Sequence, residues 1–254
     1  MVKVIQIELL KSKRTKSFMI SFVIMLVAVV WSLLAASRSI NSPKLRTMGL
    51  FFNNLQAIPV FLPIATCLFV SRIVSNEKDG NTLKLQNSNN IKLMTVFNSK
   101  LFFSNVVFFV LNIFQILIVY LDTVSHDIEA PLSNLALQLI GLTMSSFSLL
   151  TIFLYLAMIL EKQGVLLGIG FLSGFLGIIM SETSKWLNLF FPFGGSSFLA
   201  LYRIKVLQSG EHLDYVFVWD KTVPLNFILY FIYCILIYFM VRYLLLKKQG
   251  ENYA

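Results

Sequence analysis

LFFSNVVFFVLNIFQILIVYL, residues 101–121, is apolar along almost its whole length and contains no charged side chain. An α-helix rises about 1.5 Å per residue, so about 20 apolar residues are enough to cross the hydrocarbon core of a bilayer. The stretch therefore predicts a membrane-spanning helix.

Five further segments have the same character, so six spans are predicted in all. No Asp, Glu, Lys, Arg or His lies in their central parts, where one charge would cost about 2.5–3.5 kcal/mol on insertion. Arg72 and Arg242 lie near span ends, where long side chains reach the headgroups. We expect an all-α integral membrane protein in one transmembrane domain over 1–254. The other five spans are 17–36, 56–74, 133–160, 164–180 and 225–245.

The composition agrees with this fold class. The chain is 57% hydrophobic and only 13% charged, whereas about 25% of the residues of soluble domains are charged. The first span has no small-residue cleavage site and is as long as the others, so we do not expect a removable signal peptide. Cys67 and Cys234 lie in apolar runs, which makes a disulfide framework improbable.

The basic residues predict the orientation. With both termini in the cytoplasm, 14 of the 21 Lys and Arg residues lie inside, and the outer segments carry seven basic and seven acidic residues. The net charge of +9 then lies entirely on the cytoplasmic side, as the positive-inside rule requires. The basic residues thus anchor the topology and are too dispersed to follow a nucleic-acid backbone.

Two polar segments on the predicted cytoplasmic side stand out. Residues 1–16, MVKVIQIELLKSKRTK, alternate apolar and basic positions and predict an amphipathic helix on the membrane surface, with a mobile basic anchor as the alternative. Residues 75–100 form an amphipathic cytoplasmic loop that begins with Glu77 and Asp79. A short helix bound to a soluble protein would suit this loop, although it could instead lie on the membrane.

Small and polar residues inside the spans predict helix packing. Gly164/Gly168 and Gly170/Gly174 are small-xxx-small pairs that allow another helix to approach closely, and Gly177 follows on the same span. Pro59 and Pro63 permit a bend in the second span. The amides in the third span and the small hydroxyl residues in the fourth are expected to bond neighbouring helices; they are Asn105, Asn112, Gln115, Ser145, Ser146, Ser148 and Thr151.

Residues 181–224 form the largest outer segment. It is rich in aromatic residues and is broken at Pro192 and Gly194–Gly195, which predicts re-entrant or interfacial helices rather than a folded domain. Its aromatic side chains are candidates for contact with a substrate; they are Trp186, Phe190, Phe191 and Phe193.

Several kinds of chemistry are missing. The sequence contains no Walker A lysine loop and no ionisable residue within a span that could act as a catalyst, so no catalytic or cofactor-binding residue is expected. His126 lies near Asp122, Asp127 and Glu129, but the spacing favours a solvated acidic loop over a metal site. A stand-alone secondary transporter or channel is a distant alternative, because carboxylates at the bilayer midplane are lacking.

IELLKSKRTKSF at 7–18 and EKDGNTLK at 77–84 resemble the basic interface helix and the E-x-x-G-T-L-like stretch of ABC-2 transporter permeases. The resemblance covers essentially the full length. It implies a coupling helix that docks on an ABC ATPase dimer, with ATP and Mg²⁺ bound by that partner, and a second permease that is a paralogue or an identical copy. The coupling residues so implied are Glu77, Asp79, Gly80, Thr82, Leu83, Ile91 and Lys100.

Within this family, the chain looks most like the lantibiotic (bacteriocin) immunity permeases. This resemblance implies a multi-pass protein of a Gram-positive cell membrane that removes an antimicrobial peptide. Export of another drug, lipid or peptide is the alternative.

Overall fold

The computed structural model describes residues 16–40, 45, 47–52, 57–80, 93–182, 185–209 and 212–251. The predicted interface helix over 1–16 lies outside these residues, apart from Lys16, as does the middle of the predicted coupling loop.

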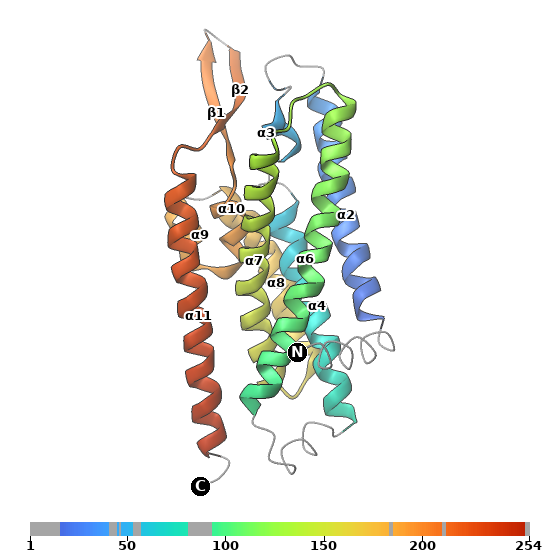
Figure 1. Cartoon of the computed structure of the whole chain (residues 1–254), viewed down its shortest axis with the longest axis vertical. Coiled ribbons are helices and arrows are strands. Elements are labelled where there is room, and N and C mark those ends of the chain that lie inside the picture. The colour runs from blue at the N-terminus through green and yellow to red at the C-terminus, as the bar shows by residue number, and fades with distance from the viewer. Residues whose placement is uncertain are drawn as a thin grey trace.

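Six long helices form the body of the protein (Figure 1), and each is long and apolar enough to cross a membrane. The prediction of an all-α fold with several spans is thus confirmed. The first residues of α2 and the last residues of α11 lie toward the same end of the bundle. The helices are α2 (Ser17–Ser39), α4 (Ile58–Asp79), α6 (Leu93–Ser125), α7 (Leu132–Ile159), α8 (Gln163–Glu182) and α11 (Val223–Glu251).

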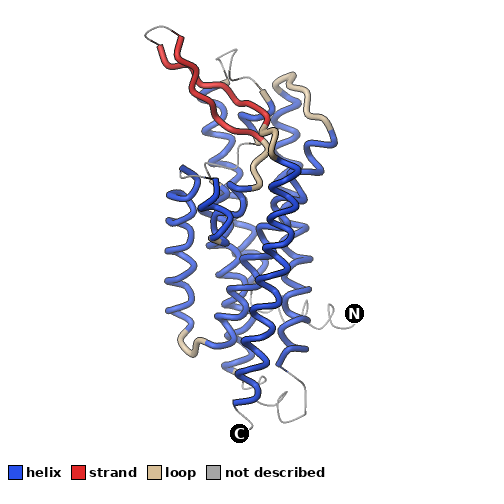
Figure 2. The backbone as a smooth tube through the Cα atoms, turned by 90° about the vertical axis from the view of Figure 1, so that its left-hand side faces the viewer, coloured by secondary structure: helices blue, strands red, loops and turns tan. Residues whose placement is uncertain are grey.

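Short elements lie toward the opposite end of the bundle, which we call the hairpin end (Figure 1). They are α3 (Met48–Phe51), α9 (Lys185–Phe190), the 3₁₀ turn η1 (Pro192–Gly194) and α10 (Gly195–Phe198), followed by strands β1 (Tyr202–Ser209) and β2 (His212–Trp219). The strands pair in antiparallel register from Tyr202↔Trp219 to Ser209↔His212. Figure 2 shows this hairpin projecting past the ends of the helices.

The expectation of interfacial helices throughout 181–224 is wrong for 202–219, which form this hairpin. β-Branched and aromatic residues such as Val216, Phe217 and Val218 favour strands. Membrane contact does not account for all of the apolar residues in this segment. Some of them pack one strand against the other, as in the edge-to-face pair of Tyr202 and Trp219, whose ring centroids are 5.5 Å apart.

The predicted loop over 75–100 is also shorter than expected. α4 continues to Asp79 and α6 begins at Leu93, so both flanks of that segment are helical. Hydropathy detects only the part of a helix that lies in hydrocarbon, and the polar turns beyond it remain helical because they pack on neighbouring helices.

α4 is the centre of the bundle. Within its spanning window 67% of the residues are buried, against 22% for α2 and 28% for α8 and α11. It packs against α2, α7 and α8, and α7 in turn packs against α6 and α11. Cys67 and Cys234 are both buried and free, as the sequence predicts.

The backbones of α4 and α8 lie in direct contact with each other. A Cβ on Gly174 would lie 2.7 Å from the Val60 carbonyl oxygen, and one on Gly177 would overlap the Pro59 carbonyl oxygen. Pro63 has no N–H to donate one turn back to Pro59, so the Pro59 carbonyl lacks its usual partner in the helix. Contact with a Cα of α8 partly replaces the missing bond, because Cα–H groups are weak donors. The predicted small-residue packing therefore holds for this half of α8.

The N-terminal half of α8 differs. Gly164 and Gly168 are exposed, and an added Cβ at either would meet nothing within 4 Å. This predicted pair is therefore not used in packing among the residues that the structure describes.

Gly177→Ala is expected to destabilise the protein by about 1–3 kcal/mol, because the methyl group must separate two backbones. Gly168→Ala is the matched control, and in open space it should be neutral or stabilising by about 0.5–1 kcal/mol. Thermal unfolding of the purified protein measures both. Equal melting temperatures for the two variants would contradict the close α4–α8 contact.

Candidate functional site

The last turns of α4 place two neighbouring charged residues against two different helices. Glu77 turns into the bundle, where its Oε1 lies 3.0 Å from the Nζ of Lys100 on α6. The two side chains are only 5% and 1% exposed. Lys100 Nζ also donates to the Ile73 carbonyl oxygen at 3.5 Å. Two residues predicted separately for the coupling loop therefore form an ion pair that is buried between α4 and α6.

A buried pair of this kind fixes geometry more than it adds stability. Desolvating two charges offsets most of their attraction, but removing one partner alone costs about 3–5 kcal/mol. The pair joins α4 and α6 on either side of the 80–92 connection. The pair therefore fixes the end of α4 against the start of α6.

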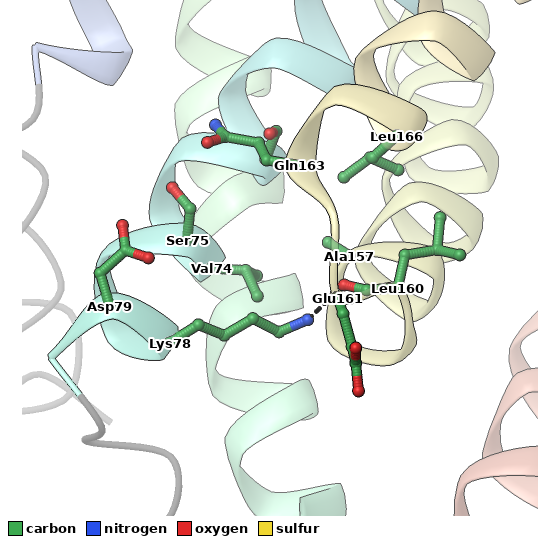
Figure 3. Close-up of a pocket in the computed structure, with 10 residues that line it drawn as sticks. Val74, Ser75, Lys78, Asp79, Ala157, Leu160, Glu161, Gln163 and Leu166 are labelled. Atoms are coloured by element: carbon green, nitrogen blue, oxygen red, sulfur yellow. Dashed lines mark hydrogen bonds between the residues drawn. The ribbon is translucent and has the colours of Figure 1, made fainter.

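Lys78 contacts the end of another helix, α7. Its Nζ donates to the carbonyl oxygen of Leu160, the residue directly after α7, at 2.6 Å. A cation is favourable here because the carbonyls at a helix C-terminus carry partial negative charge. Figure 3 shows Lys78 reaching across a cavity of about 50 Å³ that Asp79, Glu161 and Gln163 also line. Adjacent side chains thus connect α4 to α6 and to the α7–α8 junction.

The other predicted coupling residues lie apart from this cluster or outside the described chain. Gly80 is exposed and ends α4, where its N–H donates to the Asn76 carbonyl at 3.1 Å. Thr82, Leu83 and Ile91 lie outside the described residues.

The four aromatic candidates for substrate contact form a surface rather than a pocket. Trp186 and Phe190 lie one turn apart on α9 and are 64% and 72% exposed. Phe191 stacks on Phe193 with ring centroids 5.5 Å apart. This apolar surface is open at the hairpin end of α8.

Some of the polar residues within the spans bond between helices, whereas others, such as Thr151, donate to a carbonyl of their own helix. Asn112 on α6 donates to the Ser146 hydroxyl on α7 at 3.2 Å, and the hydroxyls of Ser148 and Tyr230 join α7 to α11 at 2.7 Å. Asn105 differs, since it donates to the Leu101 carbonyl of its own helix.

His126 lies where α6 ends, with its Nδ1 2.8 Å from the Asp122 carbonyl oxygen. Among the described residues, no group of three or more His, Cys, Asp and Glu side chains is placed to hold a metal ion.

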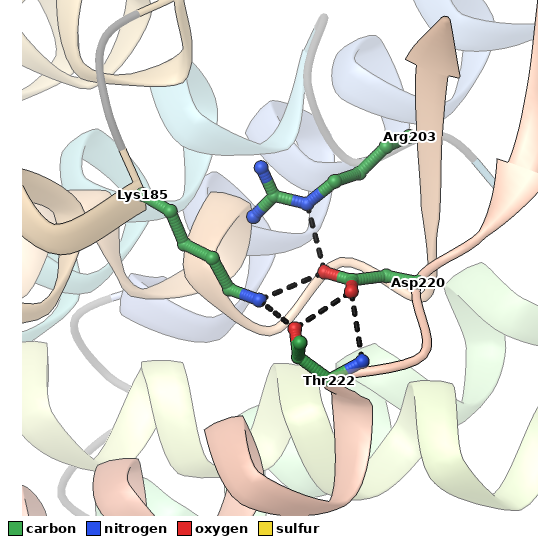
Figure 4. Close-up of polar contacts among 4 residues, drawn as sticks. All are labelled: Lys185, Arg203, Asp220 and Thr222. Carbon is green, nitrogen blue, oxygen red and sulfur yellow. Dashed lines mark hydrogen bonds and ion pairs between the residues drawn. The ribbon is translucent and has the colours of Figure 1, made fainter.

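A second ion-pair cluster closes the hairpin end (Figure 4). Asp220 Oδ2 lies 2.8 Å from both Lys185 Nζ and Arg203 Nε. Its Oδ1 accepts from the Thr222 N–H at 2.9 Å and from the Thr222 hydroxyl, which Lys185 also contacts. Asp220 therefore ties the start of α9, the hairpin and the start of α11 together.

These contacts also set the ionisation of Asp220. Burial by itself raises the pKa of a carboxyl group, but the hydrogen bonds from Lys185 and Thr222 outweigh it and hold the pKa of Asp220 well below its usual range.

Sequence reasoning missed this cluster. From the sequence, Lys185, Arg203 and Asp220 are only three of the charged residues in the predicted outer segments. Lys185 and Asp220 are also far apart in the chain. One local signal was present: Asp is a preferred residue just before an apolar helix, where its carboxylate accepts from a backbone N–H two or three residues further on.

The match to known proteins is at the level of a family. Residues 4–180 match the family described as "ABC-2 family transporter protein". Comparison with curated proteins and with solved structures gives no match.

Lys100→Met is expected to lower the free energy of unfolding by about 3–5 kcal/mol, because it leaves the Glu77 carboxylate buried without its cation. The double variant Glu77→Gln/Lys100→Met should recover most of that loss, since it buries no net charge. Chemical denaturation in detergent measures both. A double variant as unstable as Lys100→Met would show that the pairing does not govern the stability of this site.

Asp220→Asn should lower stability at pH 7 by about 1.5–3 kcal/mol through weaker hydrogen bonds to two cations. Because the pKa of Asp220 is lower in the folded than in the unfolded state, its contribution is complete above the usual Asp pKa of about 3.9 and is lost as pH falls below it. The difference in melting temperature from wild type should therefore be constant from neutral pH to about pH 5 and narrow below that. Asp127→Asn, at an exposed position, is the control; an equal effect there would contradict the role of the cluster.

Proposed function

This chain belongs to the ABC-2 family of transporter proteins, and from that premise we propose that it expels an antimicrobial peptide of the lantibiotic class from the cell membrane. The family match over residues 4–180 carries the assignment as a permease, the membrane-spanning component of an ABC transporter, which works with an ABC ATPase. The peptide class rests on a resemblance to the immunity permeases in chain size and in the LLKSKRT stretch at 9–15, which also suggests a Gram-positive cell.

In this proposal, ATP and Mg²⁺ bind an ATPase dimer that docks on the 80–92 connection from the cytoplasm. The chain itself contributes the mechanical path. Displacement of the connection would pull on Glu77 and Lys78, whose contacts with Lys100 and Leu160 would carry the motion into α6 and α7. α8 would follow α4, because the backbones of the two helices touch.

A second permease, paralogous or identical, would complete the transport path. The exposed aromatic residues Trp186 and Phe190 suit contact with an amphipathic peptide at the membrane surface, because aromatic side chains prefer the interface between water and hydrocarbon. Export of another drug, lipid or peptide would use the same coupling and differ only at this surface.

The test is purification of the tagged chain from its native cells in mild detergent, with identification of every protein that accompanies it. We expect an ABC ATPase, which should be lost when Leu83 and Ile91 are both changed to Ala because these changes remove apolar docking contacts. Asp127→Asn, in the α6–α7 connection, should retain it. A chain that purifies alone at every expression level would contradict the ATPase partnership.

Survival of the same cells against a panel of lantibiotics tests the substrate. Deletion of the gene should sensitise the cells to at least one member, and Lys100→Met should behave like the deletion. Unchanged survival, with the ATPase still bound, would retain the permease assignment and replace the peptide by another exported substrate.

A further inference from the structure

A deep groove lies between α6 and α11, with α7 as its floor. Its volume is about 710 Å³. It exists because α7 packs against both neighbours, whereas α6 and α11 touch each other over a much shorter length. Phe102 on α6, Phe147 on α7 and Phe231 and Ile235 on α11 are among its lining residues.

All of the lining residues lie in helices that are long and apolar enough to cross a membrane, and the lining is predominantly apolar, so hydrocarbon is the environment that suits the groove best. Water is a poor occupant, because a buried water needs two to four polar partners and these walls are mostly apolar. An empty groove would leave the surrounding side chains without van der Waals contacts. An apolar molecule from the membrane fits both conditions.

The volume suits a slender chain better than a whole protein helix. A 20-residue helix about 10 Å wide and 30 Å long occupies on the order of 2,400 Å³, which is several times the groove. The measured volume instead lies within the range of about 300–1,000 Å³ that is usual for sites of small molecules. A second permease helix could lie across the groove but could not fill it.

One end of the groove is polar. The Tyr238 hydroxyl on α11 donates to Asn98 Oδ1 on α6 at 3.1 Å and bridges the two walls. Phe231, Ile235 and Tyr238 recur at helical spacing, and the next position in this row is Arg242. Arg242 is exposed, and Tyr243 beside it is 68% exposed, as is typical of an aromatic residue at the membrane interface.

We propose that this groove binds one acyl chain of an anionic phospholipid, with the phosphate of that lipid against Arg242. The apolar walls recognise the chain, and the guanidinium complements the negative headgroup, to which arginine can donate two parallel hydrogen bonds. The lipid would fill the gap between α6 and α11 and hold α11 against the bundle. This inference does not depend on which substrate the transporter exports.

The experiment is native mass spectrometry of the intact complex, reconstituted in nanodiscs of equal phosphatidylglycerol and phosphatidylcholine and released into mild detergent. The wild type should retain one phospholipid per chain, with about a fivefold preference for phosphatidylglycerol from a single basic residue. Ile235→Trp should lose the retained lipid, because the indole fills the groove. Leu236→Trp, on the exposed side of α11, should retain it.

Arg242→Gln should retain the lipid but lose the preference for phosphatidylglycerol. If Ile235→Trp does not yield an intact complex, Thr143→Phe fills the groove from α7 and replaces it. Equal lipid retention by wild type and groove-filling variants would overturn the proposal, as would an unchanged headgroup preference in Arg242→Gln. Loss of a second permease chain in Ile235→Trp, without loss of lipid, would assign the groove to that chain instead.

Discussion

The rest of the structure depends on the backbone contact between α4 and α8. Pro63 leaves the Pro59 carbonyl without its usual partner, and Gly174 and Gly177 bring the backbone of α8 close enough to cover that region. In a bilayer the hydrophobic effect does not drive helices together, so close packing of this kind has to do so. It makes α4 the most enclosed span and leaves α2, α8 and α11 with wide faces toward lipid.

Polar contacts then hold the ends of the other elements in place. At the end of α4, Glu77 and Lys78 connect the helix to α6 and to the end of α7. At the hairpin end, Asp220 connects α9, β1 and α11. Between these two clusters α11 is held mainly by α7, and the groove beside α6 is the consequence. The weakest lateral contact among these neighbours is between α6 and α11, so a relative movement of α11 would disturb the fewest contacts there.

The spans could be predicted from the sequence, because a run of about 20 uncharged apolar residues rarely forms anything but a membrane-spanning helix. It could not place helix ends such as 75–79 and 93–100, where polar turns remain helical through packing that hydropathy does not record. It identified Glu77 and Lys100 separately as coupling residues but not as a pair, since their contact depends on how two helices pack. The hairpin was missed because apolar content was attributed to lipid contact. The Asp220 cluster was missed because its partners are distant in the chain.

The proposed mechanism requires that α4 and α8 move as one rigid unit, relative to α11, when ATP binds the partner ATPase. Double electron–electron resonance between pairs of spin labels measures this movement, with Cys67 and Cys234 replaced by serine. One label pair joins exposed positions 72 on α4 and 163 on α8, and the other joins 72 and 243 on α11. When the transporter complex is trapped with ATP, the account predicts an unchanged distance for the first pair and a shifted distance for the second. A changed distance between α4 and α8 would contradict it.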